Sequence, residues 1–405
     1  LGILCEQGRG GEIGDDALAF SCFRKAAELG DVKALYNLGV LFEQGRGTAK
    51  DDLQAADCFR KAAEQGHAMA QFNLGILYEN GRGRLPKDDQ QAVSWWLQAA
   101  KQGHAKAQFN LGIMFENGRG VPRDFAQAMY WYRQAAEQGN PKAQLNLGFM
   151  YADARGVPRD DMRAVTWFFK AAQQGDPIAQ YNLGIAYDVW HELANDPNQA
   201  AFWFLQSARQ GHIGAQFNLA VKFASGEGVP KDLIQAVYWY HKSADQGHAG
   251  AQFNLGVMYA VGRGVPQNDE QAIYWYRKSA AQGDANAQCN LGFMHEHGHG
   301  VPKDDKLALY WYMHAADQGN AGARLNLGVK YANGQGVIQD PVVAYAWLDL
   351  AAEQGAVDAQ ATRESVVRQM SPEQLEEAKI LARKWAEKPV GSWRNSPEGW
   401  AGRTV

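Results

Sequence analysis

The chain of 405 residues has little of several features that mark whole classes of protein. It contains only 4 cysteines, too few for a scaffold held together by disulfides. No run of apolar residues approaches the roughly 18 that a membrane-spanning helix needs, so we expect no membrane insertion. Lysine plus arginine (40) almost balances aspartate plus glutamate (44). A formal net charge of −4 therefore gives no reason to expect nucleic acid or an anionic membrane as a partner.

What the sequence does contain is a repeated string. Ala-Gln-Phe-Asn-Leu-Gly at 70–75 recurs in close copies at a step of 36 residues, with a single step of 37. The copies begin at Ala34, Ala70, Ala107, Ala143, Ala179, Ala215, Ala251, Ala287 and Ala323. Self-similarity at such a period is the signature of a solenoid, in which each unit packs chiefly on its neighbours.

The repeat divides the chain into expected units. Residues 1–33 are predicted to be a truncated first repeat, because Leu1–Gly8 match part of the later units. Nine full repeats follow at 34–69, 70–106, 107–142, 143–178, 179–214, 215–250, 251–286, 287–322 and 323–358. After these we expect C-terminal capping helices at 359–388 and a tail at 389–405. Ser371, Pro372 and Gln374 have the pattern of a helix start with a capping box.

Each unit is predicted to form two helices. The first, at about 70–80, places Ala70 and Leu74 on one face and stops at Gly81, which supplies left-handed geometry. The second, at about 124–138, carries a broad apolar stripe that includes Trp131. Tryptophan recurs at this place every 36 residues from 95 to 347. We therefore expect these rings to form a row in the core of the stack.

Three motifs together resemble a known family. They are Ala-x-x-x-Leu-Gly-x-x-Tyr, Gly-x-Gly-Val-x-x-Asp and Ala-x-x-Trp-Tyr-x-x-Ala-Ala-x-x-Gly, and they cover residues 1 to about 358. The chain resembles the Sel-one-like repeat family, a relative of the tetratricopeptide repeat. The resemblance implies an all-α, right-handed α-α superhelix (solenoid) of about ten 36-residue helix-turn-helix repeats, with a groove lined by the first helices. It also implies a non-enzymatic adaptor, often bacterial, in envelope assembly, signalling or host contact.

Two units depart from the pattern. The unit at 179–214 lacks the Gly-x-Gly loop and has different residues at 188–197, and Ala220 replaces a glycine in the next unit. One interpretation is a local change in curvature. The other is a partner-specific feature in which an exposed Trp190 acts as the anchor.

The most regular polar feature is an asparagine before the leucine of each string. The asparagine row consists of Asn37, Asn73, Asn110, Asn146, Asn182, Asn218, Asn254, Asn290 and Asn326. An asparagine amide can donate to and accept from a peptide backbone, and related tetratricopeptide solenoids hold extended peptides with an asparagine at this place. One hypothesis is that the members from Asn73 to Asn290 bind a peptide. The alternative is that the amides bond neighbouring helices and only stabilise the stack.

Other polar residues are interpreted structurally. The loop arginines, such as Arg82 and Arg119, are expected to form local ion pairs with turn aspartates such as Asp88 and Asp124. The histidines between 295 and 299 could suggest zinc, but they take places that other units fill with tyrosine, asparagine and arginine. We therefore expect no metal site. The histidines that follow a helix-ending glycine are read as cap residues: His67, His104, His212 and His248.

No motif of an enzyme is present, so we expect no catalytic residues and no cofactor. The predicted function is a protein–protein interaction scaffold that binds a protein or an extended peptide in its groove. One alternative is a cell-envelope, host-interaction or toxin-neutralising protein that clamps one folded partner. Another is a hydrolase that acts on cell-wall material. The oligomeric state and the partner's identity are left open, and a bacterial periplasm or cytoplasm is the expected compartment.

Overall fold

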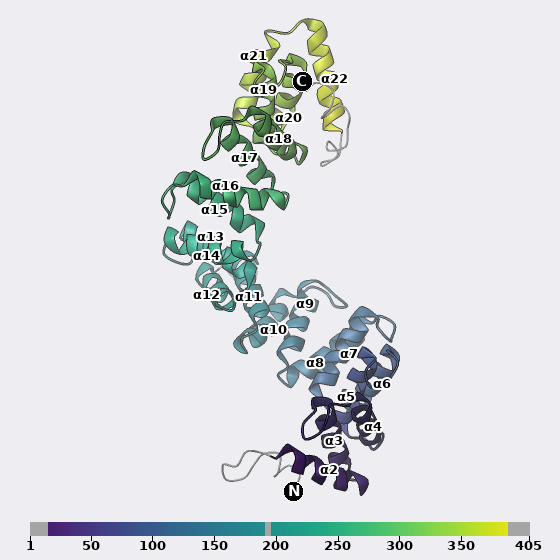
Figure 1. Ribbon diagram of the computed structural model, residues 1–405. Coiled ribbons are helices and arrows are strands. Elements are labelled where there is room, and N and C mark those ends of the chain that lie inside the picture. Colours follow the sequence, from purple (N-terminus) through teal and green to yellow (C-terminus); the bar gives the residue numbers. More distant parts are fainter. Residues whose placement is uncertain (1–14, 191–195, 388–405) are drawn as a thin grey trace. The chain divides into compact units, whose positions relative to one another are not determined.

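The computed structural model describes residues 15–190 and 196–387, and within these ranges every regular element is a helix (Figure 1). First and second helices alternate along the chain, as the repeat predicts. The first helices are α3 (Val32–Gln44), α5 (Ala68–Asn80), α7 (Ala105–Asn117), α9 (Pro141–Ala152), α11 (Pro177–Val189), α13 (Ile213–Ser225), α15 (Ala249–Val261), α17 (Ala285–His297) and α19 (Ala321–Asn333). The second helices are α2 (Asp16–Glu28), α4 (Asp52–Glu64), α6 (Asp89–Lys101), α8 (Phe125–Glu137), α10 (Asp161–Gln173), α12 (Pro197–Arg209), α14 (Leu233–Asp245), α16 (Asp269–Ala281), α18 (Asp305–Asp317) and α20 (Pro341–Glu353).

Contacts divide the chain into two compact units, Leu1–Asp196 and Pro197–Val405. Inside each unit, a first helix packs on the second helix of its own repeat and on the second helix of the preceding one. This is the all-α solenoid arrangement that the sequence predicts. The boundaries of the individual repeats given above remain predictions. The segment Leu1–Gly8 and the tail at 389–405 lie outside the described residues.

The helix ends follow from particular residues. Gly81 ends α5 in the left-handed conformation with φ 65°, where a residue with a side chain would be strained. Asp124 caps α8 by accepting hydrogen bonds from the backbone N–H groups of Ala126 and Gln127. These ends confirm the two predicted helices to within two residues.

The residue after the tryptophan supplies the largest fully buried side chains of the core. Tyr132 is fully buried, and a methyl group at Gly112 on the facing helix would overlap its ring. Trp96 occupies the same place beside Gly75 and is 1% exposed. The expected tryptophan row is also largely buried, with Trp131 at 7%. Glycine on the first helix thus makes room for a large ring on the second.

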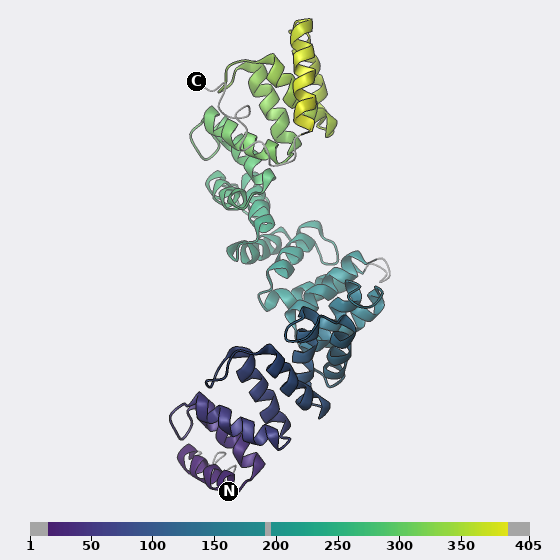
Figure 2. The ribbon, with the colours of Figure 1, turned by 90° about the vertical axis from the view of Figure 1, so that its right-hand side faces the viewer.

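Two further helices follow the last repeat, α21 (Val357–Val367) and α22 (Pro372–Ala386). The predicted capping box at Ser371 is present, since its side chain and that of Gln374 bond each other's backbone N–H groups. α22, the yellow helix in Figure 2, packs along α20. The ring centroids of Trp385 and Trp347 lie 4.6 Å apart. The end of the second unit is therefore covered by an amphipathic helix.

Candidate functional site

The asparagine row lies at the same place on every first helix. All of its members are half-buried, and each is followed by a buried leucine. The side chains therefore lie at the border between the packed interior and solvent. A polar group at such a border can bond within the fold, bind a ligand, or do both.

Four members of the row bond a tyrosine of the preceding repeat. The Asn146 amide on α9 donates to the Tyr132 hydroxyl on α8. The same bond joins Asn254 to Tyr240, Asn290 to Tyr276 and Asn326 to Tyr312. Burial raises the pKa of these tyrosines, to about 12 for Tyr276, and the asparagine bond acts in the opposite direction. These amides help to join successive repeats.

The remaining members have other surroundings. Asn73 bonds Tyr36 on the preceding first helix. Asn182 donates from Nδ2 to the carbonyl oxygen of Ile178 in its own helix, at 2.8 Å. In the repeats before Asn37, Asn110 and Asn218, the position that corresponds to Tyr132 is not a tyrosine. It is occupied by Phe23, Trp96 and Phe204, respectively. Because these three residues carry no hydroxyl, these members of the row lack the bond that holds Asn146.

The tyrosine bonds extend into a longer polar network. Tyr132 Oη donates to Glu116 Oε2 at 2.7 Å, and Glu116 also pairs with Arg155 of the next repeat's loop at 3.0 Å. In the second unit, Tyr312 Oη donates to Glu296 at 2.7 Å. Part of the asparagine row is therefore connected to charged groups at the repeat boundary.

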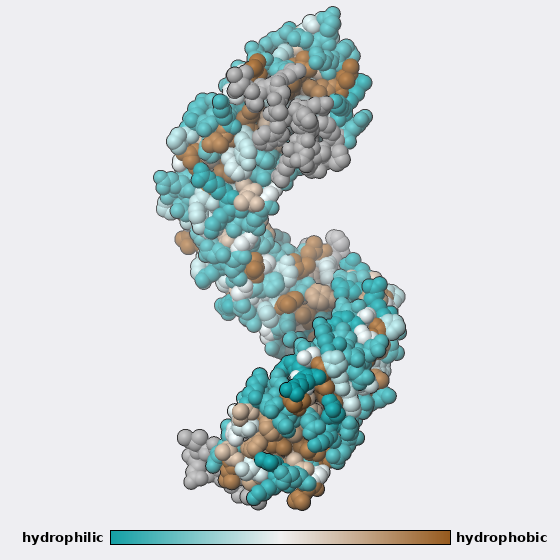
Figure 3. Space-filling model, turned by 45° about the vertical axis from the view of Figure 1, so that its right-hand side comes forward, coloured by the Kyte–Doolittle hydropathy of each residue, from teal (hydrophilic) through white to brown (hydrophobic). Residues whose placement is uncertain are grey.

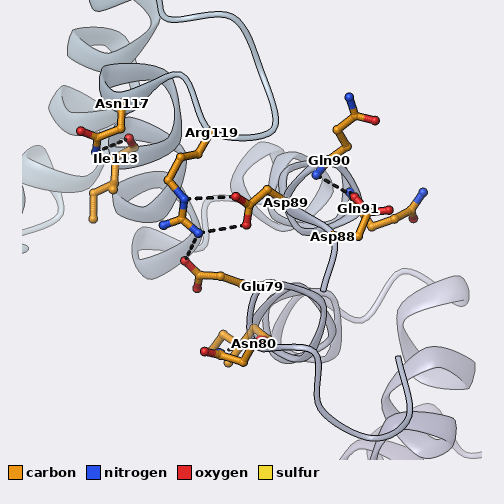
Figure 4. A network of polar contacts seen from close by, with 10 residues as sticks. Glu79, Asn80, Asp88, Asp89, Gln90, Gln91, Ile113, Asn117 and Arg119 are labelled. Atoms are coloured by element: carbon orange, nitrogen blue, oxygen red, sulfur yellow. Dashed lines mark hydrogen bonds and ion pairs between the residues drawn. The ribbon is translucent and has the colours of Figure 1, made fainter. Parts of the chain in front are cut away.

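The loop arginines pair across the repeat boundary, as Figure 4 shows for Arg119. Its Nη2 lies 2.9 Å from Asp89 and 3.2 Å from Glu79, both in the preceding repeat. Arg82 pairs with Asp52 in the same way, and this bond lowers the pKa of Asp52. The expectation of ion pairs is correct, but that of turn aspartates as partners is wrong for these two arginines. Asp88 and Asp124 cap helices instead, because their side chains accept from the first backbone N–H groups.

Two repeats have neither arginine nor histidine at the loop place, and both have a lysine five residues earlier in the sequence. The loop residues are Glu227 and Gln335, and the lysines are Lys222 and Lys330 at core places that hold methionine in α7, α15 and α17. Lys330 is fully buried, and its Nζ lies 3.0 Å from Glu296 and 3.1 Å from Asp305. These acids occupy the same repeat positions as Glu79 and Asp89. The cation at this repeat boundary therefore comes from the helix instead of the loop.

Trp190 directly follows α11 as its C-cap and is half-buried. The Arg159 guanidinium lies 6.0 Å from the centroid of its ring. The adjoining residues 191–195 of the altered loop lie outside the described residues. At Ala220, the facing Tyr240 stays buried at 4% exposed, so the methyl group is accommodated. The role of Trp190 as a partner anchor remains a prediction.

The histidines between 295 and 299 have separate surroundings. His295 is buried, the His297 ring bonds the Phe293 carbonyl oxygen at 3.0 Å, and His299 Nδ1 lies 3.6 Å from Asp269. In the part of the chain that the structure describes, no three His, Cys, Asp or Glu side chains form a group that could hold a metal ion.

Four first helices begin at a histidine, as expected for cap residues. Nδ1 of His67, His104, His212 and His248 accepts from a backbone N–H in the first turn, at 3.1–3.3 Å. Burial lowers the pKa of His104 and favours the neutral ring that can accept this bond. The His104 and His248 rings also lie against Phe72 and Phe217, two aromatic neighbours of the asparagine row.

A second polar row escaped the sequence analysis. The glutamine of the repeated string is buried in α5, α7, α9, α11, α13, α15 and α17. Gln108 donates to the Ala100 carbonyl oxygen of the preceding repeat at 3.1 Å and accepts from Gln138 at 2.7 Å. The signal was present, since the glutamine recurs in every copy of the string from Gln71 to Gln288, but a polar residue beside a buried alanine was not read as core.

Comparison with known proteins identifies the repeat. A family model described as "Sel1 repeat" matches residues 1–31, 32–67, 68–104, 105–140, 141–176, 177–212, 213–248, 249–284, 285–320 and 321–355. No curated protein matches the chain. Among described residues, no helix is long and apolar enough to cross a membrane.

Two solved structures are similar in sequence and in fold. One is c5321, described as a protective antigen present in uropathogenic Escherichia coli strains that displays an SLR fold. It is 36% identical with a TM-score of 0.86, and the match covers 99% of this chain and 84% of that one. The other is a Sel1 repeat protein from Oxalobacter formigenes, 35% identical with a TM-score of 0.59, covering 75% of this chain and 87% of that one.

Proposed function

Because the chain belongs to the Sel1 repeat family, whose solenoids commonly mediate contacts between proteins, we propose that it is a non-enzymatic scaffold that binds a protein or an extended peptide along its first helices. The observation that carries this proposal is the asparagine row, which presents one half-buried amide per repeat at a fixed place. Regular spacing suits a polypeptide, because a peptide backbone offers the same donor and acceptor at every residue.

The tyrosine bonds are compatible with this role. An asparagine amide has two N–H donors and a carbonyl acceptor. The bond from Asn146 to Tyr132 uses one donor and leaves the second N–H and the carbonyl oxygen for a ligand. It also holds the amide in one orientation, which lowers the entropy lost on binding. Asn110 and Asn218 have no tyrosine at that place, so they are the members in which binding and folding can be separated.

The apolar neighbours of the row supply contact area. Phe72 and Phe217 are half-buried. Their rings pack against those of His104 and His248, respectively. Aromatic rings held in this way can contact a ligand with little loss of side-chain entropy. The row therefore combines backbone-type hydrogen bonds with apolar surface.

The test uses a random-peptide display library selected against the whole chain. A selected peptide is then measured with the variant Asn110→Ala/Asn218→Ala. We expect at least tenfold weaker binding, roughly 1.4 kcal/mol, with an unchanged melting temperature. The matched control is Asn117→Ala, which removes an exposed side-chain amide that lies off the row. A lower melting temperature with full peptide binding in the double asparagine variant would contradict the proposal.

A second candidate is contact with a host. It rests on the similarity to c5321, which is described as a protective antigen, over 99% of this chain. Host contact requires the protein to be exposed on the cell. Antibodies raised against the purified chain should then label intact source cells, and labelling only after lysis would exclude this role.

A further inference from the structure

The second helices of the second unit carry a row of exposed aromatic side chains. We call Phe202, Tyr238, Tyr274 and Tyr310 the aromatic row. They are 36 residues apart and 47%, 48%, 47% and 40% exposed. Each ring packs edge-on against the tryptophan that follows it, with centroids 4.9–5.1 Å apart. The exposed rings are therefore held in place, which favours binding.

The row is specific to the second unit. At the same place in the first unit, Ser94 and Thr166 flank Tyr130, which is 52% exposed and packs on Trp131 in the same way. Exposed aromatic residues are therefore not required at this place for the repeat to fold. Figure 3 shows apolar residues as brown patches within a mainly hydrophilic surface. Tyr130 provides a matched but isolated copy of the feature.

Cations accompany the aromatic row. Lys242 Nζ lies 5.7 Å from the Tyr238 ring centroid and Lys278 Nζ lies 4.6 Å from that of Tyr274. Tyr274 and Lys278 line a cleft of about 490 Å³, whose lining also includes the charged Arg277 and Glu270 and the apolar Ile273 and Val301. Its charged lining carries two positive groups and one negative group. The cleft beside the row therefore combines apolar residues with a net positive charge.

The chain itself places an amphipathic helix on this face of a second helix. In α20 the place of Tyr310 is taken by Ala346, which is fully buried, and Val342 beside it is 7% exposed. α22 packs along α20. Its buried residues are Ala378, Ala382 and Trp385. The exposed face of a second helix can therefore accept a helix that presents an apolar stripe.

We propose that the aromatic row binds an amphipathic helix of a partner protein, whose apolar stripe covers the rings and whose acidic flank pairs with Arg277 and Lys278. Charge complementarity selects acidic flanking residues over basic ones. This site goes beyond the peptide-binding role of the first helices and does not use the asparagine row. The two proposals can therefore fail independently.

The test uses a fluorescein-labelled helical peptide of about 18 residues, or five turns. Leucines follow the spacing of the buried residues in α22, and glutamates occupy both flanks. A second peptide has lysine in place of every glutamate. Fluorescence anisotropy measures the affinity of each peptide for the whole chain. We expect the acidic peptide to bind the wild type more tightly than the basic peptide does.

Three variants locate the site. Tyr274→Ser should weaken acidic-peptide binding about tenfold, as for an aromatic anchor. Serine occurs naturally at the matching place, 94, so the fold should accept it. Lys278→Glu should reduce or reverse the preference between the two peptides. Tyr130→Ser, the matched control, should bind like the wild type, and so should Asn110→Ala/Asn218→Ala.

Several outcomes would overturn the proposal. They are failure of the wild type to bind the acidic peptide, equal binding by Tyr274→Ser and Tyr130→Ser, and loss of binding in every variant alike. Sedimentation that shows association of two copies, abolished by Tyr274→Ser, would assign the row to self-association instead. Helical circular dichroism and melting of each variant must match the wild type for the comparison to count.

Discussion

Lys330 allows a sharp test of how the repeats are joined. Replacing it with methionine, the residue at the matching place in α17, removes the cation and keeps the core filled. Glu296 and Asp305 then lose this cation, although Glu296 still accepts from the Tyr312 hydroxyl and Asp305 still lies 3.9 Å from Lys303 Nζ. Breaking a buried ion pair costs roughly 3–5 kcal/mol. The Glu296 and Asp305 side chains are 21% and 34% exposed, however, so water can hydrate their carboxylates after the substitution. We expect Lys330→Met to destabilise the second unit by about 2 kcal/mol.

The second half of the test restores the cation from the loop. Gln335→Arg places arginine where Arg119 lies in its own repeat, facing Glu296 and Asp305. In the Lys330→Met background it should regain about 1 kcal/mol or more, because it replaces the missing charge. In the wild type the same substitution should add little stability, since Lys330 already forms ion pairs with both carboxylates.

The assay is urea unfolding followed by circular dichroism, with hydrogen exchange of α17 and α19 as a local measure, because repeats can unfold separately. The reasoning predicts that the effects of the two substitutions are not additive. Equal gains from Gln335→Arg in both backgrounds would refute it. So would an unchanged stability of Lys330→Met.

Three further outcomes are expected. Trp96→Ala should cost about 3–5 kcal/mol in thermal or urea unfolding, because the ring is 1% exposed and fills the space beside a glycine. Gln108→Ala should cost about 1–3 kcal/mol by the same assay, because it leaves the Ala100 carbonyl oxygen without its side-chain donor. Acidification should weaken the capped helices, since burial lowers the pKa of three capping histidines in the fold. In the unfolded chain these histidines have their ordinary pKa of about 6.5, so they bind protons there before they do in the fold. The free energy of unfolding should therefore fall as the pH drops from about 6.5 to the lower pKa values of the folded state. The three histidines are His67, His104 and His248. Replacing them with asparagine, the residue that caps α9, should flatten this part of the pH–stability curve.

The period and the helix ends could be predicted from the sequence because each has a local cause. Gly81 ends a helix through its own φ, and Asp124 caps one through its own side chain. The repeat then carries these ends to every unit. Family membership followed from the same motifs, which include residues from both helices.

Contacts between repeats were harder to predict. The partners of Arg119 are 30 and 40 residues away, in the preceding repeat, so proximity in sequence pointed to the wrong aspartates. The asparagine row shows the same difficulty. Identical residues have different partners, because the preceding repeat offers tyrosine to Asn146 and tryptophan to Asn110. The pattern of one residue type cannot show what its neighbours provide.

The central claim is that side-chain amides on the first helices bind the partner polypeptide. Selective ¹⁵N labelling of asparagine makes their side-chain resonances visible, and the Asn110→Ala and Asn218→Ala variants assign two of them. Addition of the library-selected peptide should shift the Asn110 and Asn218 side-chain signals. Shifts confined to asparagines off the row, such as Asn117 and the helix cap Asn140, would contradict the account.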